Sequence, residues 1–247
     1  MTDSDAFEWI PREHAAAEAP LVLTCEHASE RLPAPWSWSE RDQRLIGTHW
    51  SHDIGAADIT RAIARALGCA AVLSRFSRLL VDPNRALDQP GLFRERAEGE
   101  PVELNAGLAP DERQRRLDRY YHPFHRAIER MLVDNPGAPL LSVHTFTPRY
   151  EGAHRAMEIG VLFTRHERPA WALADRLGHA GFVVALNEPY SALDGFASSP
   201  ERHADAHARP WIELEIRQDI AADVARWQPL AATLAAEVPK IFASESG

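Results

Sequence analysis

LVLTCEH at residues 21–27 is typical of a short buried strand, but it ends in a histidine instead of a turn residue. A second strand-like run, PLLSVHT at 139–145, also closes with a histidine, and a third, PWIELEIRQ at 210–218, contains a glutamate near its end. In an open α/β sheet, ligands bind beyond the carboxyl ends of the strands, where residues distant in the sequence meet. Ionisable side chains at such ends predict a metal site. The side chains concerned are His27, His144 and Glu215.

Short aliphatic and β-branched runs bounded by turn residues predict further strands. Strands are expected near residues 20–26, 70–75, 78–82, 139–144, 157–163, 181–186 and 210–216. Helical patterns lie between them, at 53–68, 111–135, 168–181 and 219–238. Because strands and helices alternate, we predict an α/β fold of three layers, with one domain over residues 1–247.

The helix predicted over 53–68 has defined ends, with Asp53 placed as its N-cap and Gly68 as its C-terminal glycine. Two long segments, 86–108 and 187–208, carry Pro, Gly and mixed charge without periodicity. We expect both to be long ordered loops. Long loops in compact domains are often functional.

Composition excludes several classes of protein. The 247 residues are 45% hydrophobic, which is enough for one large α/β core. The net charge is −9, and no Lys and Arg run is interleaved with aromatic residues, so a nucleic-acid partner is not expected. The acidic start does not resemble a signal peptide, and no apolar run approaches a membrane span, so we expect a cytoplasmic protein without a membrane partner. Only Cys25 and Cys69 are present, and we expect two buried, reduced thiols. The sequence makes no prediction of oligomeric state.

The first chemical pattern combines His27 and Glu30, three residues apart, with the distant His144. Two imidazoles and one carboxylate leave a fourth zinc position open, as in zinc hydrolases, which predicts one Zn²⁺ per chain. Glu26 and Asp53 are rival carboxylates for the third ligand, and Asp53 has the alternative role of helix cap. The alternative for the whole pattern is a capped loop with a structural histidine.

The second pattern is SRLLVDPNR at 77–85, which contains Arg78, Asn84 and Arg85. A guanidinium binds a carboxylate bidentately, and a neighbouring amide can donate beside it, so this group predicts a site for an acidic substrate. The alternative is an internal ion pair of either arginine with Asp82 or Asp88.

The third pattern is IELEIRQD at 212–219, in which strand alternation places Glu213 and Glu215 on one face. A carboxylate there could take a proton from water and pass it to a leaving amine, and we assign this role to Glu215. The alternative is a salt bridge from Glu215 to Arg217.

Two residues of NEPYS, Asn187 and Tyr190, follow another predicted strand and could contact a substrate. A turn-forming role explains the asparagine equally well. Four further histidines have spacings of three or four residues but are expected to be mainly structural, with His203 or His207 as a minor possibility for the site. They are His122, His125, His203 and His207. His49 and His52 flank the start of the first helix and are expected either to support it or to support the metal ligands from behind.

Six motifs in order, CEHASERLP, HDIGA, SRLLVDPNR, SVHTFTP, NEPYS and ELEIRQDI, together resemble the N-formylglutamate amidohydrolase family. That family is related in fold to zinc carboxypeptidases and to aspartoacylase and succinylglutamate desuccinylase. The resemblance implies a phosphorylase/hydrolase-like mixed sheet with helices on both faces. It also implies three sets of roles: zinc ligands His27, Glu30 and His144, substrate-positioning residues Arg78, Asn84 and Arg85, and the general base Glu215. Family members commonly have Asn or another residue at the position of Glu30, so Asp53 and Glu26 stay open as ligands.

The expected activity is hydrolysis of a small, anionic N-acyl amino acid, with N-formyl-L-glutamate as the favoured example. Arg85 and Asn84 would hold the α-carboxylate, and Arg78 would stabilise the oxyanion or bind a second carboxylate. The alternatives are a metallo-carboxypeptidase or amidase that acts on another acylated amino acid or a cell-wall fragment, and a non-catalytic binding protein on the same fold.

Overall fold

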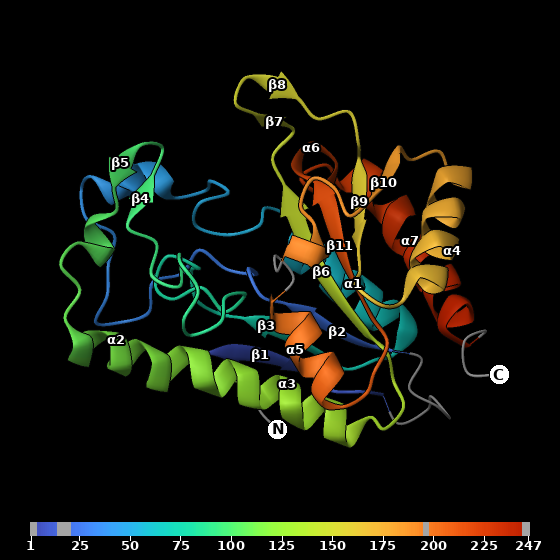
Figure 1. Cartoon of the computed structure of the whole chain (residues 1–247), viewed down its shortest axis with the longest axis horizontal. Helices are drawn as coiled ribbons and strands as arrows, with labels where there is room; N and C mark the ends of the chain where they lie inside the picture. Colours follow the sequence, from blue (N-terminus) through green and yellow to red (C-terminus); the bar gives the residue numbers. More distant parts are fainter. Residues whose placement is uncertain (1–3, 14–20, 195–197, 244–247) are drawn as a thin grey trace.

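A mixed sheet of seven strands forms the centre of the computed structural model, and helices cover both of its faces (Figure 1). The structure describes residues 4–13, 21–194 and 198–243. The strand order is β1-β3-β2-β6-β11-β9-β10. The strands are β1 (Phe7–Ile10), β2 (Val22–Cys25), β3 (Ala71–Ser74), β6 (Leu140–Phe146), β9 (Ile159–Leu162), β10 (Val184–Leu186) and β11 (Trp211–Arg217). Two small hairpins lie outside the sheet, β4 (Arg96–Ala97) with β5 (Glu100–Pro101) and β7 (Arg149–Tyr150) with β8 (Ala153–His154).

The four central strands β3, β2, β6 and β11 run parallel to one another. At one edge β1 pairs antiparallel with β3, and on the other side β9 pairs antiparallel with β11 and parallel with β10. The register places Glu215 directly beside His144 and Thr24 beside Ser142. The carboxyl ends of β2, β6 and β11 therefore meet, as the sequence pattern predicts.

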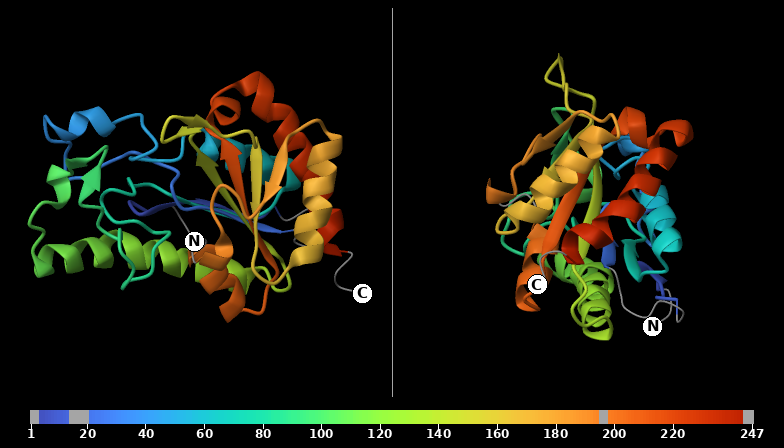
Figure 2. Two further views of the ribbon diagram at one scale, coloured as in Figure 1. Left: turned by 45° about the horizontal axis from the view of Figure 1, so that its top comes forward. Right: turned by 90° about the vertical axis from the view of Figure 1, so that its right-hand side faces the viewer.

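Helices on the two faces complete the three layers. The helices are α1 (Ala56–Leu67), α2 (Pro110–Arg116), α3 (His122–Asp134), α4 (Glu167–His179), α5 (Ser198–Ala206), α6 (Gln218–Ala221) and α7 (Val224–Ala243). The views in Figure 2 show α1 packed next to α7, with α3 on a different side of the sheet. The predicted α/β fold with three layers and a mixed sheet is confirmed.

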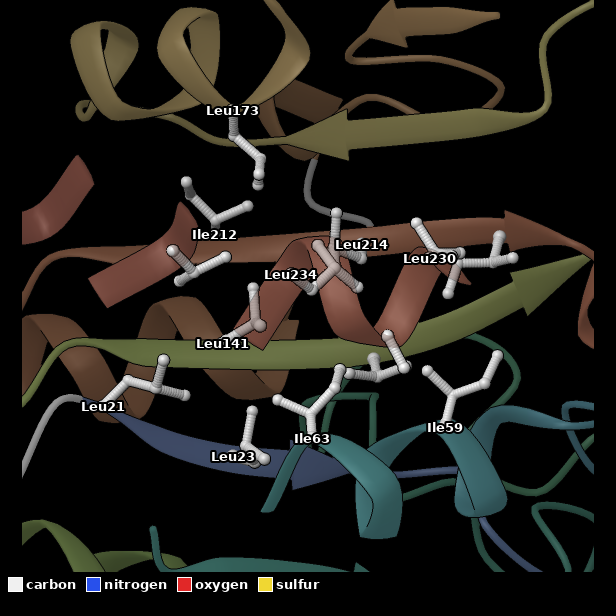
Figure 3. Packing of buried hydrophobic residues seen from close by; sticks show 14 of the residues in the cluster. Leu21, Leu23, Ile59, Ile63, Leu141, Leu173, Ile212, Leu214, Leu230 and Leu234 are labelled. Atoms are coloured by element: carbon white, nitrogen blue, oxygen red, sulfur yellow. The ribbon is translucent and has the colours of Figure 1, made fainter. Parts of the chain in front are cut away.

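Side-chain alternation along the strands separates two hydrophobic clusters. Leu21 and Leu23 join the cluster under α1, α4 and α7, whereas Val22 joins the cluster under α3. Figure 3 shows the first cluster from close by, with leucine and isoleucine side chains of the three helices facing those of the strands. Burial of each such side chain contributes about 1.5–3 kcal/mol, so this packing fixes the strand ends that carry the site.

The strand expected near 78–82 is wrong. Residues 78–80 form a turn in which Leu80 donates its backbone N–H to Ser77, and the apolar run is buried in loop packing instead of a ladder. The seventh strand of the sheet is β1, which the sequence pattern did not predict. In this edge strand Phe7 is the one buried side chain, so buried and exposed residues do not alternate. The other six predicted strands correspond to strands of the sheet, although residue 20 lies outside the described segments.

The helix predicted over 53–68 forms as α1 and ends at Gly68, which has a left-handed φ of 60°. The N-cap assignment of Asp53 is wrong, because Gly55 occupies that position and the Asp53 carboxylate points elsewhere. The pattern over 111–135 forms α2 and α3 joined by one wider turn, and the pattern over 219–238 forms α6 and α7. The segment 187–208 is not only a loop, because it contains α5, although residues 195–197 lie outside the described segments. No helix in the described segments has the length and apolar character needed to cross a membrane.

Candidate active site

A pocket of about 250 Å³ opens at the meeting point of the strand ends. This volume lies below the range that suits drug-sized ligands, which favours a small metabolite. Most of the residues singled out in the sequence line it, namely His27, Asp53, Arg78, Asn84, Arg85, His144, Tyr190, Glu213 and Glu215. Glu30 and Asn187 do not.

Three buried side chains, His27, Asp53 and His144, form a group that could hold a metal ion. The Oδ2 atom of Asp53 lies 2.9 Å from Nδ1 of His144 and 3.4 Å from Nδ1 of His27. Two backbone contacts position this carboxylate: Asp53 N–H donates to the His27 carbonyl, and Thr145 N–H donates to Oδ2. Two imidazoles and one carboxylate form a donor set that suits zinc.

Each of the two histidines has a second carboxylate on its other ring nitrogen. Nε2 of His27 lies 2.8 Å from Asp82, and Nε2 of His144 lies 3.1 Å from Glu26. Histidines that bind metals usually donate their outer N–H to a carboxylate, which fixes the ring and its tautomer. The surroundings of both rings therefore fit a metal held at Nδ1.

The structure distinguishes the three carboxylates that the sequence left open. Glu26 lies behind His144 and also accepts hydrogen bonds from the Ser142 and Ser199 hydroxyls. Burial would raise the pKa of Glu26, but these hydrogen bonds and His144 lower it to about 2. Glu30 is 41% exposed, accepts from the Gly47 N–H and lies outside the pocket. The arrangement therefore favours Asp53 as the third ligand, with Glu26 supporting His144.

The carboxylates of Glu213 and Glu215 face the pocket from β11. Each has an Oε2 atom that lacks a hydrogen-bond partner among the described residues, although Glu213 Oε2 lies 3.7 Å from Nε2 of His144. Burial raises the pKa of Glu213 to about 7 and that of Glu215 well above its usual range. The alternative salt bridge of Glu215 does not form, because Arg217 pairs with Asp219 and Glu158. Two buried carboxyl groups are thus poised to exchange protons with a ligand.

Arg78 forms the ion pair with Asp82 that the sequence offered as an alternative. Its Nη2 lies 2.9 Å from Asp82 Oδ2, and its Nη1 lies 3.4 Å from Asp53 Oδ1. Burial would lower the pKa of Arg78, but the two carboxylates raise it. Asn84 accepts from Ser199 N–H through Oδ1 and donates its own backbone N–H to Asp82. Arg78 thus lines the pocket and, through its contacts with Asp53 and Asp82, also helps to position the candidate metal ligands.

The two candidate substrate-binding residues of the NEPYS loop have different positions in the structure. Tyr190 lines the pocket, and burial raises the pKa of its hydroxyl. Asn187 has a left-handed φ of 50°, and its amide exchanges hydrogen bonds with both backbone groups of Phe163. Asn187 therefore holds the loop in place, the turn-type role that the sequence also allowed.

Three other histidines, His125, His203 and His207, form a separate cluster where α3 meets α5. His203 contacts Glu129 and lies 2.8 Å from His125 Nδ1, and His207 lies 2.6 Å from the same Glu129 carboxylate. This cluster does not line the pocket. Both cysteines are buried and unpaired, and burial raises the pKa of Cys25 to about 12, which makes its thiol a poor nucleophile.

Several lining residues escaped the sequence reasoning: His49 as a direct pocket residue, Trp50, Arg94, Thr145, Phe146, Thr147 and Tyr150. Thr145 to Thr147 follow His144 directly, so their position was available from the strand end itself. Arg94 lies in the segment 86–108, whose length was the only signal for it.

The three-layer fold thus brings two buried histidines and several buried carboxylates together at the carboxyl ends of its strands. The chain belongs to the N-formylglutamate amidohydrolase family, whose model matches residues 19–222. It is similar to an N-formylglutamate deformylase of Pseudomonas putida, with 32% identity over 126 residues, which cover 46% of this chain and 45% of the relative. The match thus spans less than half of that curated relative.

Two solved structures are similar over nearly the whole chain. A gene product of Agrobacterium tumefaciens has 29% identity and a TM-score of 0.87, with 98% of this chain and 96% of that chain covered. An N-formylglutamate amidohydrolase of Ralstonia eutropha JMP134 has 20% identity and a TM-score of 0.71, with 98% of each chain covered. The second likeness shows the shared fold.

Proposed function

We propose that this protein hydrolyses the amide bond of a small N-acyl amino acid, with N-formyl-L-glutamate as the favoured substrate, to give formate and glutamate. The observation that carries the proposal is the buried group of His27, Asp53 and His144 beside the carboxylates of Glu213 and Glu215, each of which has one oxygen without a hydrogen-bond partner among the described residues. The family and the name of the Pseudomonas putida relative support the choice of substrate.

The cofactor that we propose is one Zn²⁺ per chain, held by His27, Asp53 and His144. The carboxylates behind both imidazoles and the open pocket in front of them support this choice. When bound, zinc supplies a Lewis acid that polarises the acyl oxygen and makes a water molecule more acidic.

Glu215 takes the proton from the attacking water and passes it to the amine as the C–N bond breaks. Burial raises the pKa of Glu215, which favours the form that holds the proton between these two transfers. Arg78 faces the pocket beside Asp53, and in this position its guanidinium can stabilise the charge that develops on the acyl oxygen. Arg85 and Asn84 hold the α-carboxylate of the substrate, and Tyr190 closes the pocket wall.

A release assay over a panel of N-acyl amino acids tests this function. We expect the zinc-loaded protein to release formate and glutamate in equal amounts from N-formyl-L-glutamate, and a chelator to stop the release until zinc is returned. Faster release of the amino acid from an N-acetyl or N-succinyl derivative would contradict N-formyl-L-glutamate as the favoured substrate but would still support amide hydrolysis. Binding without any release would favour the non-catalytic alternative and contradict the proposal.

A further inference from the structure

Three arginines, Arg78, Arg85 and Arg94, line the pocket. Arg78 is committed to the protein, because two buried carboxylates, Asp82 and Asp53, already accept its hydrogen bonds. The Arg78 guanidinium therefore lies beside the group of His27, Asp53 and His144, but it has few N–H donors left for a second anion.

Arg94 is in a different situation. Its guanidinium carbon lies 5.5 Å from the centre of the Trp50 ring, which holds it by a cation–π contact. Its backbone carbonyl accepts a hydrogen bond from the buried Asn105 amide, so the segment that carries it is anchored. Within the described segments, Arg94 forms no ion pair with an Asp or Glu.

Burial and the nearby charges of Arg78 and Arg85 disfavour the charged form of Arg94 and lower its pKa, although the Asp82 carboxylate acts in the opposite direction. Asp82 already forms hydrogen bonds with Arg78 and His27, so the half-buried Arg94 has no ion-pair partner of its own among the described residues, which is an unfavourable arrangement for the protein alone. An anionic ligand in the pocket would stabilise the charged Arg94, because a carboxylate can accept two parallel hydrogen bonds from its guanidinium group.

We propose that Arg94 binds the side-chain carboxylate of the substrate and is the residue that determines the preference for a charged over an uncharged amino-acid side chain. This inference rests on the proposed function, which already assigns the α-carboxylate to Arg85 and Asn84. It places the two anionic groups of the ligand on separate arginines of one pocket. It also leaves Arg78 to the reacting acyl group.

The test compares N-formyl-L-glutamate with N-formyl-L-glutamine, which has the same shape but no side-chain charge. We expect Arg94→Gln to lower kcat/KM for N-formyl-L-glutamate by about 10- to 100-fold, mainly through KM, since this is the range for a lost hydrogen bond to a charged group. Activity on N-formyl-L-glutamine should change by less than about threefold. Arg94→Lys keeps the positive charge but cannot form two parallel hydrogen bonds to a carboxylate. Its kcat/KM for N-formyl-L-glutamate should therefore lie between those of the wild type and Arg94→Gln.

Arg113→Gln is the matched control, because Arg113 contacts the same segment through Glu95 but lies outside this pocket. We expect it to leave both substrates unaffected. Equal losses on both substrates with Arg94→Gln would make Arg94 a structural residue and overturn the inference. The inference is also overturned if Arg94→Gln changes the activity on neither substrate.

Binding of the free amino acids separates this inference from the proposed function. Calorimetric titration of the zinc-loaded protein with L-glutamate and L-glutamine needs no turnover, so it remains informative if the wild type hydrolyses nothing. We expect the wild type to prefer glutamate and Arg94→Gln to lose the preference. Equal binding of both by the wild type would refute the role of Arg94, whatever the hydrolysis assay shows.

Discussion

Substitution of three carboxylates one at a time should affect zinc binding to three different extents. Asp53→Asn removes the oxygen that lies 2.9 Å and 3.4 Å from the two imidazoles, so we expect zinc affinity to fall by more than about 100-fold. Glu26→Gln removes the charge behind His144, and a supporting partner of this kind is typically worth about 10- to 100-fold, or roughly 1.4–2.7 kcal/mol. Glu30→Gln should leave the affinity unchanged, because this exposed side chain lies outside the pocket.

Competition with a chromophoric chelator measures these affinities without any need for turnover. Circular dichroism and thermal unfolding of each variant in chelator check that the fold survives the substitution. A greater loss of zinc affinity with Glu30→Gln than with Asp53→Asn would refute the assignment of Asp53 as the third ligand. Equal losses for Asp53→Asn and Glu26→Gln would instead make Glu26 a direct ligand.

Two further predictions concern stability. Since hydrogen bonds lower the pKa of Glu26 to about 2 in the folded state, its contribution of roughly 3 kcal/mol is complete above pH 4.5 and is lost as the pH falls toward 2. Urea unfolding in chelator should therefore show a constant advantage of the wild type over Glu26→Gln above pH 4.5 and a progressive loss of this advantage between pH 4.5 and about pH 2, whereas a constant difference over the lower range would contradict this. Gly55→Ala should destabilise by at least about 2 kcal/mol, because the new Cβ would lie 2.2 Å from the Ala221 carbonyl oxygen at a φ of +82°. Gly47→Ala, with φ +71° and open space around the Cβ, should have the smaller effect on the unfolding temperature, and the reverse order would refute the steric argument.

The sequence was sufficient to predict six of the seven strands of the sheet and most of the charged residues that line the pocket, for one physical reason. Buried parallel strands are continuous apolar runs, so an ionisable residue at their end stands out, and the shared carboxyl edge brings such residues together. His27, His144 and Glu215 followed from this pattern alone. The two histidine positions are close, with ring centres 4.8 Å apart.

Other features depend on contacts that no local pattern encodes. Asp53 has the spacing of a helix cap, and only the loop packing that places it beside both imidazoles reveals its other role. Glu30 has the spacing of a metal ligand, but the chain turns outward after His27 and exposes it. Arg94 carries no sequence signal apart from its long loop, because its position beside Trp50 is set entirely by tertiary packing.

Formate release and zinc content, measured together on one preparation of the wild type and of Glu215→Gln, test the proposed reaction. We predict about one zinc per chain in both proteins, release of formate from N-formyl-L-glutamate by the wild type, and a loss of turnover in the variant by about 100-fold or more. Zinc in both proteins with undiminished release by Glu215→Gln would contradict the role of Glu215. A zinc-loaded wild type that releases no formate would contradict the proposed function.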